Sequence, residues 1–229
     1  MNTEVPTLAR KAIAELLGTF VLVCFATGVI ISGVVPFMGL ALSPALAVFI
    51  LILTLGYISG AHFNPAVSLA FLLLKQMNLK EFITYVLAQL AGSAIAALSM
   101  FVIFSKAKSN VVHSGVNQLA HGTSFLTGFF LELGMTTVFI LVVLLASQVR
   151  ANEPKQWAPF SISIAVFGLL LTFGPLTGAC FNPARWFGPA LASGFWNNGA
   201  LYIFAPMIGS VLGVFTFRYL SSGAGRNPA

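Results

Sequence analysis

Six long apolar stretches limit what this chain can fold into. A helix needs roughly 20 residues to cross the hydrocarbon core of a bilayer. Only helices or closed barrels satisfy the backbone polar groups in lipid, and runs this long and continuous favour helices. The stretches cover residues 12–32, 40–58, 82–104, 125–147, 158–173 and 200–220. We therefore predict an all-α membrane protein with six transmembrane helices.

The composition agrees with a protein dissolved in lipid rather than in water. Hydrophobic residues make up 58% of the 229 residues and charged residues only 7%, whereas soluble domains carry roughly a quarter charged residues. The first stretch follows Arg10 and Lys11, as a signal peptide would. It is too long for a signal core, and no convincing cleavage site follows it, so we interpret it as the first span.

The net charge of +6 could indicate nucleic-acid binding. The basic residues lie almost entirely on one side of the predicted membrane, however, so we interpret the charge as a signal of membrane orientation instead. An even number of spans puts Lys106 and Lys108 on one side and all other basic residues outside the spans on the opposite side. By the positive-inside rule, we expect both termini in the cytoplasm, with the protein in a plasma or inner membrane. The basic residues on that side are Arg10, Lys11, Lys75, Lys80, Arg150, Lys155, Arg218 and Arg226.

Two broken apolar segments, "SGAHFNPAVSLAFLLL" (59–74) and "TGACFNPARWFGPAL" (177–191), interrupt this pattern. Asn is a strong N-cap and Pro is tolerated at the first helical position. A helix starting at either Asn would be about 16 Å long, half a bilayer. The Gly-Ala-X-Phe before each Asn is expected to be irregular backbone, which membranes tolerate where it lines water or is packed in protein. We predict two half-helices, over 64–74 and 182–192, that meet at the midplane and line a pore.

The two halves of the chain present the same features in the same order. Asn64 follows Glu15 by 49 residues and Asn182 follows Glu132 by 50. Each half contains three spans, an odd number, so the second half crosses the membrane in the opposite sense. We predict a single membrane channel domain over 1–229, with an inverted repeat over approximately 9–104 and 125–220. A third Asn-Pro-Ala, at 227–229, has no apolar run after it and is interpreted as a tail.

Paired Asn-Pro-Ala motifs, with a Glu near the start of each half, resemble the aquaporin, or major intrinsic protein, family. The resemblance extends over roughly 9–220. It implies a six-span bundle with two half-helices, usually a homotetramer with one pore per subunit. It also implies that the motif residues line the pore centre, where two helix N-termini repel cations and protons. These residues are Asn64, Pro65, Ala66, Asn182, Pro183 and Ala184.

The resemblance further implies a selectivity filter, formed at the family's offsets by Pro44, Leu170, Ala179 and Arg185. Arg185 lies one turn into the second half-helix, where a charge is costly unless it faces a wet cavity or a partner. Water-selective members usually carry His at the second filter position, and glycerol facilitators carry Asp after the Arg; Leu170 and Trp186 stand there instead. The filter is more similar to that of plant nodulin-type intrinsic proteins and their bacterial relatives, several of which pass uncharged metalloid hydroxides.

Four more residues receive roles. Glu15 and Glu132 are carboxylates inside spans, a placement that indicates function. The resemblance implies that they hydrogen-bond the irregular backbone, with direct solute contact as the alternative. His62 is expected to line the vestibule or to be satisfied by backbone, and Cys180 is expected close to the filter. Small residues are expected at close helix contacts: Gly18, Gly92, Gly128 and Gly209.

The function we expect is a passive channel for water and small uncharged solutes, such as glycerol-type polyols or metalloid hydroxides including arsenite, that excludes ions and protons. A strictly water-selective aquaporin is one alternative. An ion-coupled secondary transporter is another, although coupling needs titratable groups and only two Glu lie inside spans. No enzyme, cofactor or metal site is indicated, because the chain has no Asp and no cluster with metal-ligand spacing.

Overall fold

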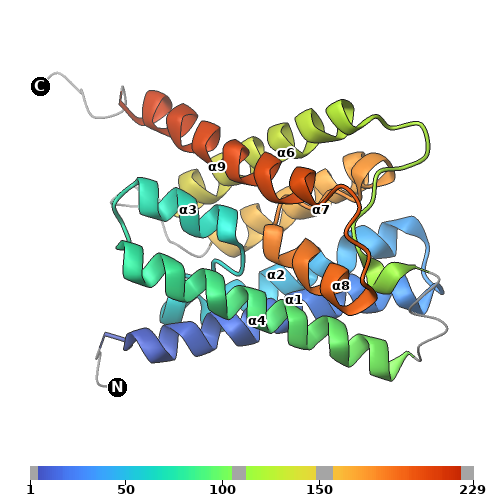
Figure 1. Ribbon diagram of the computed structural model, residues 1–229. Coiled ribbons are helices and arrows are strands. Elements are labelled where there is room, and N and C mark those ends of the chain that lie inside the picture. Colours follow the sequence, from blue (N-terminus) through green and yellow to red (C-terminus); the bar gives the residue numbers. More distant parts are fainter. Residues whose placement is uncertain (1–4, 105–111, 148–156, 223–229) are drawn as a thin grey trace, which may run out of the picture.

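The computed structural model describes residues 5–104, 112–147 and 157–222, and over these residues the chain is helical without strands (Figure 1). Several basic residues used in the topology prediction and the third Asn-Pro-Ala lie outside them: Lys106, Lys108, Arg150, Lys155, Arg226 and 227–229. Six described helices are long and apolar enough to span a membrane, which confirms the predicted fold class. They are α1 (Leu8–Ser32), α2 (Phe37–Ser59), α4 (Leu79–Ile103), α6 (Phe125–Ser147), α7 (Ala158–Thr177) and α9 (Gly199–Ser221).

Helix α7 continues four residues beyond its predicted end. It passes through Pro175 and ends at Thr177, where Gly178 adopts a left-handed φ of 78°. Two other helices hold this last turn. The Thr177 hydroxyl donates to Glu132 Oε1 at 2.7 Å, and the Thr177 carbonyl accepts from the Tyr202 hydroxyl at 2.7 Å. Tertiary contacts therefore extend the helix past the point where local composition predicts a stop.

The two predicted half-helices are present as α3 (Pro65–Leu73) and α8 (Pro183–Ser193). Figure 1 shows them starting near the middle of the bundle and running toward opposite ends. Asn64 caps α3 by accepting from the Ala66 N–H at 2.8 Å, and Asn182 caps α8 by accepting from the Ala184 N–H at 3.0 Å. A proline occupies the first position of each helix, where its missing N–H costs nothing.

Each half-helix packs mainly against the last long helix of the other half of the chain. Helix α3 lies against α9, and α8 lies against α4. Among the long helices, α1 pairs with α4 and α6 with α9, while α2 meets α7 between the halves. The pairs within the two halves match each other, as an inverted repeat requires. The bounds of the two repeats, 9–104 and 125–220, stay a prediction.

Two glycines allow the closest approach between long helices. A Cβ atom on Gly92 of α4 would lie 2.2 Å from the Leu16 carbonyl oxygen of α1, and one on Gly209 of α9 would lie 2.5 Å from the Leu133 carbonyl oxygen of α6. The backbones therefore touch at both crossings. Membrane helices associate through such small residues, because lipid supplies no hydrophobic force between them.

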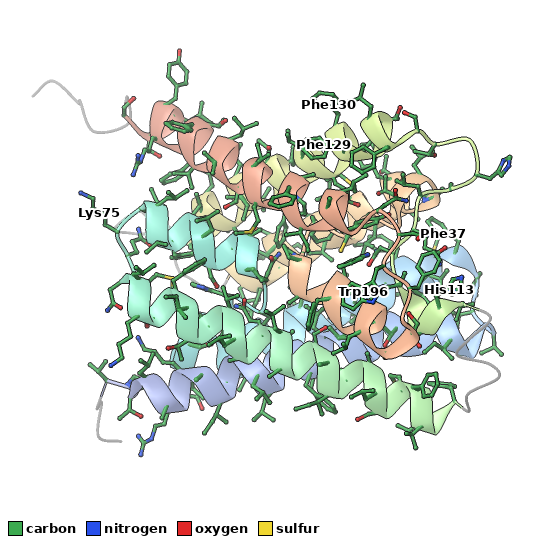
Figure 2. All side chains as sticks on the ribbon, in the orientation of Figure 1. Phe37, Lys75, His113, Phe129, Phe130 and Trp196 are labelled. Atoms are coloured by element: carbon green, nitrogen blue, oxygen red, sulfur yellow. The ribbon has the colours of Figure 1, made fainter. Side chains whose placement is uncertain are left out.

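Basic residues gather at the end of the bundle where α1 begins and where α3 and α9 end. Figure 2 shows Lys75 there. Lys11 forms an ion pair with Glu81 at 2.7 Å, and Arg218 donates to the carbonyl of Leu73, the last residue of α3, at 2.7 Å. The positive-inside rule assigns this end to the cytoplasm, and that orientation stays a prediction.

Candidate functional site

A cavity of about 340 Å³ extends along the bundle. At one end it is lined by Phe37 at the start of α2, which Figure 2 places far from Lys75. At the other end the cavity is lined by Ser147, the last residue of α6. In Figure 2, α6 begins near Phe130 and ends on the side of the bundle where Lys75 lies. The lining is mainly apolar. The cavity thus reaches from one end of the helices toward the other.

Asn64 and Asn182 both line this cavity and bond across the two halves. The Asn64 Nδ2 donates to the Phe181 carbonyl at 2.9 Å, and the Asn182 Nδ2 donates to the Phe63 carbonyl at 2.9 Å. One N–H of each amide therefore joins the two half-helices. A second N–H on each remains for a molecule in the cavity.

The residues before each Asn share one irregular backbone conformation, as predicted. Left-handed φ values occur at matching positions in the two halves: Gly60 (87°), Ala61 (55°) and Phe63 (48°), then Gly178 (78°), Ala179 (44°) and Phe181 (35°). Non-glycine residues adopt this region at a cost, so other groups must hold the backbone there. Segments 60–64 and 178–182 both line the cavity along their whole length.

Glu15 holds the first of these segments. It is fully buried and accepts from the Ser59 hydroxyl at 2.7 Å and from the N–H groups of His62 and Phe63 at 2.9 and 2.6 Å. The carboxylate replaces the hydrogen bonds that the irregular backbone cannot make with itself.

Glu132 holds the second segment in the same way. It is also fully buried, and it accepts from the Thr177 hydroxyl at 2.7 Å and from the N–H groups of Cys180 and Phe181 at 2.8 Å each. These are the contacts that a bracing role requires. Neither Glu15 nor Glu132 lines the cavity, which argues against the alternative of direct solute contact.

The four residues assigned to the filter all line the same cavity. Pro44 comes from α2 and Leu170 from α7, while Ala179 and Arg185 flank the second asparagine. Arg185 is only 8% exposed, and its Nη1 is buried without a hydrogen-bond partner among the described residues. A buried guanidinium with an open donor can bind the oxygen atom of a molecule in the cavity.

His62 and Cys180 occupy matching positions in the two segments, and both line the cavity. The His62 ring stacks on Phe71 with centroids 4.4 Å apart. The Cys180 thiol donates to the Asn182 carbonyl at 3.2 Å. The structure thus brings both asparagines, the four filter residues, His62 and Cys180 to one cavity. The other motif residues do not line it and instead form the first turns of α3 and α8: Pro65, Ala66, Pro183 and Ala184.

The sequence analysis missed two pairs of side chains, one that holds the ends of α2 and α7 and one that holds the half-helices. Tyr85 donates to the last carbonyl of α2 at 2.6 Å, and Tyr202 donates to that of α7 at 2.7 Å. The Ser210 hydroxyl donates to the Ala66 carbonyl at 2.6 Å, and Ser93 makes the corresponding bond to α8. Each pair is separated by 117 residues, as are Glu15 and Glu132. A search for equal residue types at that offset would have found them.

Replacing Ser93 by Ala is expected to loosen α8. The Ser93 hydroxyl donates to the Ala184 carbonyl and accepts from the Gly188 N–H at 3.1 Å, so the variant leaves two buried backbone groups without these partners. We expect a loss of about 1–3 kcal/mol, measured as a lower melting temperature in detergent. Ser99→Ala is the control, because that hydroxyl bonds only to its own helix, at Ile95. Equal melting of the two variants would contradict the holding role of Ser93.

Two half-helices joined beside a cavity that follows a six-span bundle define the architecture of a membrane channel. The chain belongs to the major intrinsic protein family, whose model matches residues 2–217. It is 33% identical over 235 residues to Aquaporin Z of Rhodopseudomonas palustris, covering 96% of this chain and 95% of that protein. It is 32% identical over 227 residues to Aquaporin NIP3-1 of Arabidopsis thaliana, covering 94% and 69%.

The solved structure of the aquaglyceroporin from Plasmodium falciparum has the same fold, with a TM-score of 0.86 at 25% identity. The match covers 95% of this chain and 98% of that one. Both the resemblance to the aquaporin family and the predicted fold class are thereby confirmed. Members of the family are passive channels, so the prediction that this protein is not an enzyme is confirmed as well.

Proposed function

We propose that this protein is a passive channel for water and small uncharged solutes, namely polyols or metalloid hydroxides such as arsenite, and that it excludes ions and protons. One observation carries the proposal: a single cavity along the bundle is lined by both asparagine amides and by an arginine with an open donor. A neutral solute can exchange hydrogen bonds with these groups in turn. Cations meet the positive ends of two helices and the guanidinium.

The filter residues favour solutes with an apolar side and a polar side. Pro44, Leu170 and Ala179 offer hydrocarbon, and Arg185 offers N–H donors. A polyol can place its carbon chain against the former and its hydroxyl groups against the latter. Three of these four side chains have no hydrogen-bonding group, so the filter lacks the polar side chains that a strictly water-selective ring uses to replace the hydration shell.

The cavity lining favours a channel over an ion-coupled transporter. Within the part of the chain that the structure describes, no carboxylate lines the cavity. The carboxylates of the two buried glutamates instead accept hydrogen bonds from backbone N–H groups and side-chain hydroxyls. Coupled transport needs a group that binds and releases the driving ion at the solute site, and the carboxylates are not placed for that.

Stopped-flow light scattering on proteoliposomes tests the proposal. We expect faster water efflux than from protein-free vesicles. We also expect the uptake rates of glycerol and arsenite to rise linearly with solute concentration and not to depend on a proton gradient. Permeation of water alone would establish the strictly water-selective alternative. Saturable uptake that follows the proton gradient would establish the transporter.

Assembly and orientation are proposed on the resemblance and on the charge distribution. We propose a homotetramer with one pore per subunit, which native mass spectrometry in detergent would detect. We propose that both termini face the cytoplasm of a plasma or inner membrane. Reaction of single-cysteine variants at Lys75 with an impermeant maleimide would report that orientation.

Replacing Leu170 by Phe is expected to lower glycerol permeability roughly tenfold or more relative to water, the scale on which a few methylene groups discriminate between substrates. Leu170 lines the cavity, so the larger ring narrows it for the larger solute first. Leu171→Phe is the matched control, since that residue is 37% exposed on the outside of α7 and does not line the cavity. An unchanged glycerol-to-water ratio in Leu170→Phe would remove this residue from the filter.

A further inference from the structure

A line of hydrogen bonds joins the cavity to a buried carboxylate in the first half of the chain. His62 lines the cavity, and its Nδ1 lies 3.1 Å from the Ser68 Oγ. The Gln89 Nε2 lies 3.0 Å from the same Oγ and 2.7 Å from the Glu15 Oε2. The second half carries other residues at the matching positions: Cys180, Trp186 and Pro206. The line therefore has no counterpart there and is not part of the repeated framework.

The donors and acceptors in this line determine where each hydrogen lies. An amide nitrogen only donates, and Gln89 Nε2 has two hydrogens, so one goes to Glu15 and the other to Ser68. The reverse amide orientation would place Oε1 against the carboxylate, two acceptors facing each other. The Ser68 oxygen thus accepts from Gln89 and could accept once more, but its own hydrogen also needs an acceptor. His62 Nδ1 is the acceptor within hydrogen-bond distance of that hydroxyl among the described residues. Nδ1 is then an acceptor, and the neutral imidazole carries its hydrogen on Nε2.

The His62 ring is fixed in this position by its neighbours. It stacks on Phe71 at 4.4 Å and meets the edge of Tyr85 at 5.2 Å, while its backbone N–H donates to Glu15. Because Nδ1 is occupied by Ser68, Nε2 is the ring nitrogen left to bond a molecule in the cavity. A fixed ring with one available N–H presents a donor at a defined place.

We propose that Gln89 and Ser68 are positioning residues that hold His62 as the neutral Nε2–H tautomer, so that the channel wall presents a donor there and stays uncharged in mildly acidic conditions. The inference rests on the proposed channel function and deepens it. A solute oxygen meets the His62 N–H and then the remaining N–H of Asn64 along one wall. This series of hydrogen bonds, which ends at His62, favours solutes that can accept a hydrogen bond and makes their permeation independent of pH.

A second proton on His62 is opposed by the same line. It would have to enter at Nδ1, and the Ser68 hydrogen would then lose the acceptor to which it donates. The titratable groups near the ring are Lys11 and Glu15 from α1 and Tyr85 from α4. The Lys11 cation repels a further positive charge, and Glu15 already accepts four hydrogen bonds.

Nitrogen NMR of the full-length protein in bilayers tests the tautomer directly. With ¹⁵N-labelled histidine, the His62 signals are assigned by their loss in His62→Asn. We expect one protonated nitrogen, Nε2, and one unprotonated nitrogen, Nδ1, from pH 8 down to pH 5. In Ser68→Ala we expect the Nδ1–H tautomer or the charged ring to appear, about tenfold more populated, as loss of one hydrogen bond allows. A wild-type ring with its hydrogen on Nδ1 would overturn the proposal.

Water permeability over the same pH range gives a second readout. We expect the wild type to be flat and Ser68→Ala to lose permeability as the pH falls, while Ser68→Thr, which keeps the hydroxyl, restores the flat profile. Ser163→Ala is the matched control, because that buried hydroxyl bonds only to Pro159 of its own helix and does not line the cavity. A flat profile in Ser68→Ala overturns the inference but leaves the channel function intact. Absence of water permeation in the wild type overturns the channel function itself.

Discussion

Replacing Glu132 by Leu is expected to abolish the folded channel. The carboxylate is fully buried and accepts two backbone N–H groups and the Thr177 hydroxyl. Without it, three buried donors lose their acceptor, at about 1–3 kcal/mol each. The left-handed backbone at Ala179 and Phe181 also loses the group that holds it. We expect no monodisperse protein in size-exclusion chromatography and no water permeation in vesicles.

Two further variants separate this effect from a general loss of charge. Glu132→Gln keeps the size and one acceptor oxygen, and should be destabilised less than Glu132→Leu. Glu81→Gln removes a partly exposed ion pair with Lys11, and should cost about 1 kcal/mol or less. A Glu132→Leu protein that is monodisperse and permeates water as the wild type does would show that the second segment needs no brace.

Replacing Gly92 by Val is expected to separate α1 from α4. A Cβ atom at Gly92 would lie 2.2 Å from the Leu16 carbonyl oxygen, and this neighbour is backbone, which cannot rotate away. We expect a cost of about 3 kcal/mol or more from overpacking. The loss would appear as a lower melting temperature and a smaller folded fraction after purification. Helix α4 also carries Gln89 and Ser93, so water permeation should fall with it.

Gly168 of α7 provides the matched control, since a Cβ atom there would meet nothing within 4 Å. Gly168→Val should leave the melting temperature close to that of the wild type. If Gly92→Val and Gly168→Val behave alike, the crossing of α1 and α4 does not depend on backbone contact.

The spans and half-helices were predictable because their signals are local. A run of some 20 apolar residues has few alternatives to a membrane helix, and Asn-Pro at the start of a short run combines an N-cap with a favourable first position. The end of α7 was not predictable in this way. Gly174-Pro175 indicates a stop, whereas Thr177 stays helical because Glu132 and Tyr202 hold it from other helices.

The two asparagines and the filter residues that line the cavity were predictable as a set, but their hydrogen bonds were not. The duplicated motif brought Asn64 and Asn182 to the same place, yet nothing in either segment shows that each amide donates to a carbonyl of the other half. Ser68 and Gln89 were missed for a different reason. They lie on α3 and α4 and bond to His62 and Glu15 only after those helices pack, and the second half offers no matching pair to reveal them.

The reciprocal hydrogen bonds of the two half-helices bear on the order in which such a chain can assemble in a bilayer: they join Asn64 to Phe181 and Asn182 to Phe63. During synthesis the first four helices enter before α8 and α9 exist. At that stage the Phe63 carbonyl still lacks Asn182, and the Ala66 carbonyl lacks Ser210. The cavity therefore has its full lining only after α8 is in place, and the first half-helix has its full set of supporting bonds only after the last helix has been added.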